Sequence, residues 1–313
     1  MQLEPEIQHY VDFCESFDIG EALSFDNVAL QRSQYLKMRA ALAEDIPQGL
    51  AIEDRTVTAS DGYSIPIRIY RTESQQSKQA CCLFFHGGGF VVGSIESHHD
   101  FIAELAAMTD VCIVSVEYRL SPEVQYPVAL HDCRDVLLEL VQNPETYDID
   151  PNNISISGDS AGGTLTAALC LLARDQGLAD IKGQLLIYPW CGSGVPGVAL
   201  DAGGDVPLLR ESEVSFYAQA YFGDADIDTY AAPLLEEDFK GMPPAFILTV
   251  EYDSVRADGF AYAQRLRGAG VVVEHYDAPG LVHGCVQARR SSPGTRLAFQ
   301  RWAEALKAFA QNR

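Results

Sequence analysis

The 313-residue sequence lacks the features of several large protein classes. No apolar run reaches the 18 residues that a membrane-spanning helix needs. The acidic start at positions 1–6 has no basic region followed by an apolar one, so we expect no secretory signal. Basic residues are scarce, and 22 Lys and Arg against 44 Asp and Glu give a formal net charge of −22. Because nucleic acids and anionic membranes bind basic patches, we expect neither as a partner.

Paired cysteines and cofactor motifs are also missing. None of the eight cysteines forms a C-x-x-C pair, and several lie in apolar stretches where cysteine acts as a small hydrophobe. This usage predicts a reduced chain in the cytoplasm. There is no G-x-G-x-x-G, Walker or zinc-ligand spacing, so we expect no cofactor and no metal.

Strand and helix patterns alternate through most of the chain. A hairpin over 56–70 is followed by expected strands at 80–85, 111–116, 153–157, 183–188, 244–250 and 271–276. Helices are expected between and after them at 98–108, 127–141, 161–174, 259–267 and 295–310. This alternation predicts an α/β fold with a mostly parallel central sheet and helices on both faces.

Two segments stand outside the alternation. Residues 1–50 have a helical pattern, with Leu30, Tyr35, Met38 and Leu42 spaced for one helix face. This segment is either a lid or a packing arm. Residues 191–233 interrupt the core between two strands and contain one helical stretch. Such an insertion usually lies over strand ends, where it can contribute to a lid.

The chain is organised around the sequence Gly-Asp-Ser-Ala-Gly-Gly at 158–163. A lone G-x-S-x-G arises by chance in roughly one chain of this length in ten. Here, however, an expected strand precedes it and an expected helix follows, as a nucleophile elbow requires. Ser160 would occupy a strained corner with its hydroxyl outward, beside a helix N-terminus that favours negative charge. The alternative is a glycine-rich turn without chemistry.

An activated serine needs a base, and the base needs an orienting acid. In doubly wound hydrolases the order is Ser, acid, His, and only His275 and His283 come late enough. His283 follows the last expected strand, where α/β sheets carry their chemistry, so we prefer it to His275 inside that strand. Asp253 is the favoured acid and Glu251 the alternative. Taken singly, either carboxylate would be interpreted as a helix cap or a solvated group.

A third motif, His-Gly-Gly-Gly-Phe at 86–90, directly follows a buried strand. Its glycines lack Cβ atoms, so the backbone N–H groups can turn toward an oxyanion. Loops of this type complete an oxyanion hole together with the N–H of the residue after the nucleophile, here Ala161. A chance H-G-G-G is expected roughly once in several hundred such chains. Together and in this order, the three motifs therefore indicate a catalytic serine more strongly than any one of them does alone.

With these motifs the chain resembles the hormone-sensitive-lipase family of α/β-hydrolase esterases, in its bacterial carboxylesterase and acetyl-esterase branch. The resemblance covers about positions 50–310. It implies a catalytic triad of Ser160, Asp253 and His283. It rests on His86–Phe90, Tyr118–Glu123 with Tyr126-Pro127, Gly158–Gly163, Glu251–Asp253 and His283-Gly284.

The resemblance has further implications. The backbone N–H groups of Gly88, Gly89 and Ala161 would form the oxyanion hole. Segments 1–50 and 191–233 would form a helical cap on a catalytic domain spanning 51–313. Phe90 and Trp190 are candidates for substrate binding, with ordinary cap packing as the alternative for Trp190. The family likeness also suggests a homodimer.

The chain departs from the family pattern in two places. Ser254-Val255 follows Asp253 where the family usually has Pro-Leu, and Cys285 stands where it usually has Phe. Cys285 would be either a thiol-sensitive neighbour of the site or an inert buried cysteine. Glu123 resembles a family position near the nucleophile, but an ion pair with Arg119 or another base is as plausible. Asp132 is interpreted as a carboxylate that holds the fold.

The resulting hypothesis is a serine carboxylesterase that hydrolyses short-chain acyl esters of small molecules through an acyl-enzyme. One alternative is a dedicated deacetylase of a sugar or metabolite, which would share the triad and differ in the cap. A true interfacial lipase should expose a large apolar surface around the cap. A catalytically silent small-molecule receptor on the same fold is the fourth hypothesis.

Overall fold

A computed structural model describes residues 2–18, 20, 23–73, 78–199, 204 and 206–311. In this part of the chain, eight strands form one sheet in the order β1-β2-β4-β3-β5-β6-β7-β8. β2 pairs antiparallel with both β1 and β4, and β3 to β8 run parallel to one another. The strands are β1 Leu50–Thr58, β2 Ser64–Thr72, β3 Gln79–Phe85, β4 Cys112–Val116, β5 Ile149–Asp159, β6 Ile181–Ile187, β7 Ala245–Tyr252 and β8 Val273–Val282. The expected α/β fold is confirmed.

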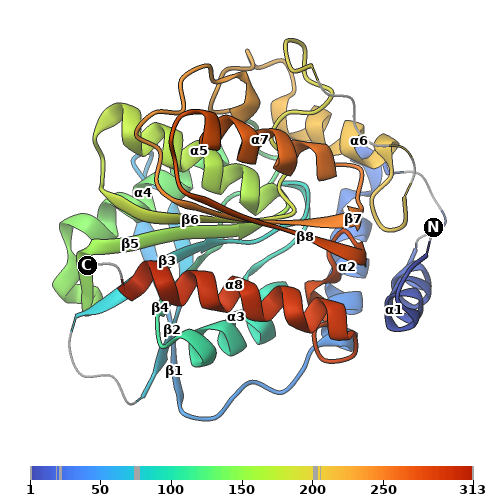
Figure 1. Cartoon of the computed structure of the whole chain (residues 1–313), viewed down its shortest axis with the longest axis horizontal. Coiled ribbons are helices and arrows are strands. Elements are labelled where there is room, and N and C mark those ends of the chain that lie inside the picture. The colour runs from blue at the N-terminus through green and yellow to red at the C-terminus, as the bar shows by residue number, and fades with distance from the viewer. Residues whose placement is uncertain are drawn as a thin grey trace.

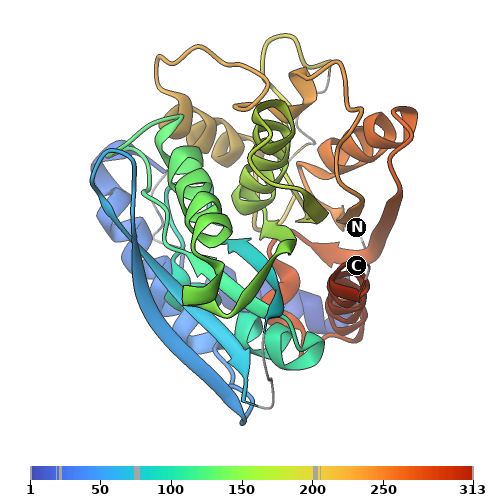
Figure 2. The same ribbon diagram turned by 90° about the vertical axis from the view of Figure 1, so that its left-hand side faces the viewer.

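Helices cover both faces of this sheet, as Figure 1 shows. The parallel strands are buried on both sides, which explains why β3 is apolar along almost its whole length. Apolar side chains of α4, α5 and α7 pack on one face, and those of α3 and α8 pack on the other. Figure 2 shows the twist of the sheet, with the hairpin β1–β2 at one edge. These helices are α3 Ile95–Thr109, α4 Val128–Gln142, α5 Ala161–Gln176, α7 Arg256–Gly268 and α8 Pro293–Gln311.

Three helices gather beside the carboxyl ends of the parallel strands (Figure 1). They are α1 Pro5–Glu15, α2 Val28–Leu42 and α6 Glu211–Phe222. Residues of all three line one cavity with Ser160 and His283. Short 3-10 turns complete the described elements: η1 Phe25–Asn27, η2 Pro144–Tyr147, η3 Pro233–Leu235 and η4 Cys285–Ala288. No helix in these described ranges is long and apolar enough to cross a membrane.

Two sequence expectations need correction. The last strand was expected at 271–276, but β8 continues to Val282 because pairing with β7 resumes between Tyr252 and Val282. The apolar face expected for α2 is wrong at Leu30, which is 42% exposed. Tyr35, Met38 and Leu42 are partly buried against core clusters, as expected. The helix also buries Val28 and two polar residues, Gln31 and Arg39, which line a cavity with a mixed polar and apolar lining. Part of the 191–233 insertion, at 200–203 and 205, lies outside the described residues.

Candidate active site

Ser160 lies at a sharp corner between β5 and α5. Its backbone has φ 53° and ψ −119°, in a region that non-glycine residues rarely adopt and that marks strain near functional sites. The neighbouring glycines permit this corner. A Cβ at Gly162 would lie 1.9 Å from the Phe85 carbonyl oxygen, and one at Gly158 would lie 2.3 Å from the Gly162 backbone. Helix and strand can therefore approach this closely only where these side chains are absent.

A hydrogen-bonded chain of three side chains begins at Ser160. Its Oγ lies 2.8 Å from Nε2 of His283, and Nδ1 of His283 lies 2.8 Å from Oδ2 of Asp253. The other Asp253 oxygen accepts from the Val255 backbone N–H at 2.9 Å, so the carboxylate is fixed at both ends. Ser160 follows β5, Asp253 follows β7 and His283 follows β8, so the sheet delivers all three to the same edge.

The two alternatives considered from the sequence lie elsewhere. Glu251 accepts from the Gly280 N–H at 2.7 Å and so ties the end of β7 to β8. His275 lies within β8, with Nε2 2.9 Å from the Thr249 hydroxyl. The structure thus places Asp253, and not Glu251, against His283.

The glycine-rich loop after β3 reaches the same corner. Gly88 has φ 124° and Gly89 has φ 59°, conformations that favour glycine. Within the described residues, the N–H groups of Gly88 and Gly89 donate to no protein acceptor. Ala161 is the first residue of α5, where a helix leaves its N–H groups without internal partners. These three donors are therefore free for a ligand.

Two hollows open at Ser160. One is an apolar pocket of about 40 Å³ beside Ala161, whose walls include Phe90 and Trp190. The ring of Phe90 is stacked on Tyr221 with 3.7 Å between centroids, which fixes that wall. The other is a cavity of about 460 Å³ with a mixed polar and apolar lining, reaching from Ser160 to α1, α2 and α6.

Comparisons with known proteins agree with this geometry. A family profile described as the alpha/beta hydrolase fold matches residues 82–287. The carboxylesterase NlhH of Mycobacterium tuberculosis is 33% identical over 288 residues, which cover 90% of this chain and 89% of that protein. Ethyl acetate hydrolase of Pseudomonas putida is 32% identical over 291 residues, covering 90% and 92%. The chain belongs to the alpha/beta-hydrolase family.

Solved structures of esterases are similar to this α/β-hydrolase over almost its whole length. A bacterial heroin esterase has a TM-score of 0.91 at 28% identity, covering 99% of each chain. A hyperthermophilic esterase from the archaeon Pyrobaculum calidifontis has a TM-score of 0.87 at 31% identity, again covering 99% of each chain. The resemblance to hormone-sensitive-lipase esterases is confirmed, and the protein is a carboxylic ester hydrolase.

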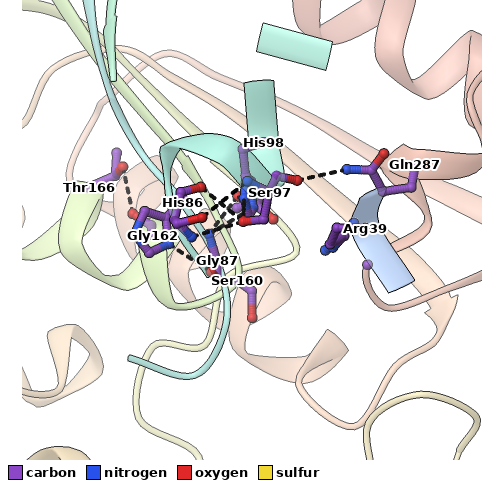
Figure 3. A network of polar contacts seen from close by, with 12 residues as sticks. Arg39, His86, Gly87, Ser97, His98, Ser160, Gly162, Thr166 and Gln287 are labelled. Carbon is purple, nitrogen blue, oxygen red and sulfur yellow. Dashed lines mark hydrogen bonds and ion pairs between the residues drawn. The ribbon is translucent and has the colours of Figure 1, made fainter. Parts of the chain in front are cut away.

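Behind Ser160 this α/β-hydrolase has a buried polar network, drawn in Figure 3. Oδ1 of Asp159 accepts from the Gly87 N–H at 2.8 Å and lies 3.3 Å from Nε2 of His98. His98 in turn contacts the Ser97 hydroxyl at 2.7 Å. Burial opposes ionisation of Asp159, but His98, the charge of Arg39 and the Gly87 N–H together outweigh it and lower the pKa of the carboxyl. The network fixes the residue before Ser160 to the glycine loop.

Sequence reasoning missed this network. The sequence places His98 only near the start of a helix. In the structure α3 begins at Ile95, with Ser94 as its N-cap. His98 lies in the first turn of this helix and is fully buried. His86, stacked on Tyr118 at 4.3 Å between centroids, is fully buried too. Burial, with a smaller effect of His98, lowers the pKa of the His86 imidazole to about 3. No motif marks a histidine as buried, and the other polar residues in the first turns of α3 gave no reason to single out His98.

Helix α1 is fastened to the segment that carries His283. The Tyr10 hydroxyl donates to the Gly284 carbonyl at 2.8 Å. The Glu4 carboxylate accepts from the Ser292 hydroxyl at 2.7 Å and from the Gly294 N–H at 3.2 Å. Nothing in the sequence pointed to these contacts, because they join residues at opposite ends of the chain.

The remaining candidates have structural surroundings. Glu123 pairs with Arg32 on α2 at 2.6 Å rather than with Arg119, which pairs with Asp132. Burial raises the pKa of the Cys285 thiol to about 12, which fits the inert interpretation. Among the described residues, no group of three or more His, Cys, Asp or Glu side chains could hold a metal ion.

Proposed function

We propose that the protein is a serine carboxylesterase that hydrolyses short-chain acyl esters through Ser160, His283 and Asp253. The observation that carries the proposal is the unbroken hydrogen-bonded chain of these three side chains at a strained corner beside free backbone donors. The curated relatives named as carboxylesterase and ethyl acetate hydrolase support the ester chemistry.

The reaction follows from the contacts. Ser160 Oγ attacks the ester carbonyl while Nε2 of His283 takes its proton. The N–H groups of Gly88, Gly89 and Ala161 hold the oxyanion of the tetrahedral intermediate, and His283 then protonates the departing alcohol. Water attacks the acyl-enzyme with His283 as base again, which releases the acid and restores the Ser160 hydroxyl. Asp253 keeps the imidazole in the tautomer that this sequence needs.

The small pocket supports a short acyl group. A cavity needs about 10–15 Å³ to hold one group the size of a water molecule. The pocket of about 40 Å³ therefore holds on the order of three such groups. That corresponds to an acetyl to butyryl chain between Phe90 and Trp190. We also propose that segments 1–50 and 191–233 act as the cap over this site, since α1, α2 and α6 line the larger cavity.

The test is hydrolysis of p-nitrophenyl esters from acetate to palmitate by wild type and two variants. We expect activity on the short esters, a loss to near background in Ser160→Ala, and a fall in kcat of about 10⁴ in Asp253→Asn. Ser64→Ala, exposed at the start of β2, and Glu251→Gln serve as matched controls that should retain most activity.

Four outcomes would contradict the proposal. If Ser160→Ala keeps its activity, Ser160 is not the nucleophile. If Glu251→Gln loses as much activity as Asp253→Asn does, Asp253 has no special role. An optimum at palmitate would favour the interfacial lipase. If wild type hydrolyses no ester and Ser160 fails to react with an organophosphate, the silent-receptor hypothesis gains instead.

A further inference from the structure

The larger cavity contains a buried arginine that has no carboxylate partner among the residues that the structure describes. Arg39, on the inner side of α2, is only 8% exposed and lines the cavity together with Ser160 and His283. To the described residues its guanidinium makes one hydrogen bond, from Nη2 to the Tyr35 hydroxyl at 2.6 Å, and its Cζ lies 4.9 Å from the centroid of the Tyr35 ring. Its Nε is buried with no partner among the described residues. Figure 3 draws Arg39 near Ser160 and Gln287, with no contact to either.

The other buried arginine of the described residues, unlike Arg39, has carboxylate partners. Arg289 is the other buried arginine in the described ranges, and it pairs with Asp100 and Glu104, both at 2.8 Å. Arg39 has no carboxylate within 4 Å in the same ranges. The carboxylate of Asp159 acts on Arg39 only at longer range, because its own hydrogen bonds go to Gly87 and the His98 side. A buried cation without a hydrogen-bonded counterion is costly, so a ligand that supplies one is stabilised.

The groups around Arg39 are arranged for a planar anion. A guanidinium binds a carboxylate through two parallel N–H bonds. The hydrogen bond to the Tyr35 hydroxyl and the contact with its ring restrict how the Arg39 guanidinium can turn. The Tyr35 hydroxyl accepts from Arg39, while its own proton has no acceptor in the described part of the chain. Arg39 and Tyr35 therefore offer several donors to one ligand group.

We propose that the enzyme is selective for esters that carry a carboxylate, which Arg39 and Tyr35 bind in the larger cavity. The proposal rests on the esterase function proposed above and names its substrate class. With the short acyl chain in the pocket of about 40 Å³, the alcohol half of the ester occupies the cavity of about 460 Å³. The substrate class is thus a short-chain acyl ester of a hydroxy acid.

The experiment compares two acetate esters that differ in charge: 4-acetoxybenzoate and its neutral methyl ester. In Arg39→Met we expect KM for the acidic ester to rise about tenfold to a hundredfold, as for loss of a charged hydrogen bond. KM for the neutral ester should change little. Arg39→Lys keeps the charge but not the planar fork, so it should recover part of the loss.

Lys37→Met is the matched control. It removes the same charge from the same helix, but Lys37 is exposed and does not line the cavity. It should leave both esters as in wild type, since the net charge of −22 acts on every variant alike. A second pair, mono-4-nitrophenyl succinate and 4-nitrophenyl butyrate, moves the charge to the acyl half. Dependence on Arg39 for the acetoxybenzoate supports the proposal, whereas dependence for the succinate ester alone would place the carboxylate in the acyl half and overturn the assignment to esters of hydroxy acids.

Equal changes for acidic and neutral esters in Arg39→Met would overturn the proposal, because a purely structural arginine would affect both. Failure of esterase function is a different result, in which wild type hydrolyses no neutral ester. Calorimetric titration of 4-hydroxybenzoate and 4-hydroxybenzamide then tests the cavity without turnover. Binding of the acid alone, lost in Arg39→Met, supports the carboxylate site, and equal or absent binding of the two overturns it.

Discussion

Buried ionisable groups lie directly behind Ser160. The Asp159 carboxylate stays ionised in spite of burial because His98 and the Gly87 N–H stabilise its charge. His86, two residues before Gly88, is held neutral by its burial. A neutral imidazole and a fixed carboxylate give the glycine loop a rigid support, but only over the pH range in which both keep these states.

His86 therefore makes folding pH-dependent. An unfolded histidine titrates near 6.5, whereas burial lowers the pKa of folded His86 to about 3. Between these values the unfolded chain binds a proton that the folded chain does not, so stability falls as pH falls. From pH 7.5 to 5, we expect wild type to lose about 2 kcal/mol more free energy of unfolding than His86→Asn in urea denaturation.

The control for this measurement is His9→Asn, which removes an exposed histidine from α1. It should show the same acid sensitivity as wild type. If His86→Asn loses as much stability in acid as wild type does, the neutral state of His86 is not the cause.

Sequence motifs predicted some residues of this site and not others. Ser160, Asp253 and His283 could be chosen because their order along the chain and their positions after strands are constrained by the fold. Arg39 could not, since one arginine in an amphipathic helix has no signature. Its burial depends on which side of α2 faces the strand ends. The apolar pattern indicates that side correctly at Tyr35 and Met38, which line the same cavity, but it gives no reason to expect a buried arginine there.

The corner between β5 and α5 is the element on which the site depends most closely. Backbone atoms of the strand, the helix and β3 approach one another where Gly158 and Gly162 have no side chain. Sequence reasoning predicted this element well because a strand, a turn and a helix are local. It predicted the end of β8 poorly, since the Pro279-Gly280 pair reads as a breaker while pairing to the neighbouring β7 continues to Val282.

A methyl group added at this corner should be strongly destabilising. In Gly162→Ala the new Cβ would meet the Phe85 carbonyl at 1.9 Å, and neither backbone can move without distorting the sheet. We expect a loss of about 3 kcal/mol in the free energy of unfolding, measured by denaturant titration. Gly268→Ala is the control, because Gly268 ends α7 with nothing within 4 Å of an added Cβ. It should be neutral or slightly stabilising, and a similar loss in both variants would contradict the steric argument.

The whole molecule carries a formal net charge of −22. Many arginines pair with carboxylates at the surface, but exposed pairs contribute little each and leave an excess of acidic groups unpaired. Self-repulsion among those groups opposes the compact state. Two further expectations concern the whole molecule, namely that it forms a homodimer and that it is located in the cytoplasm. Both remain predictions.

Added salt should therefore stabilise the enzyme. Raising NaCl from 0.01 to 0.15 M shortens the screening length from about 30 to about 8 Å, which weakens repulsion between distant carboxylates more than it weakens close ion pairs. We expect the unfolding temperature to rise by about 3 °C. Glucose at equal osmolality controls for solute effects and should not reproduce the shift. A lower unfolding temperature in salt would mean that the surface ion pairs outweigh the repulsion.

The fastening of α1 to the segment around His283 has a consequence for synthesis on the ribosome. Tyr10 emerges first but bonds to Gly284, and Glu4 bonds to Ser292 and Gly294. The residues up to Gly294 must therefore be synthesised before α1 can make these contacts. The cavity that α1 helps to line is thus complete only after the segment around His283 has been added to the chain.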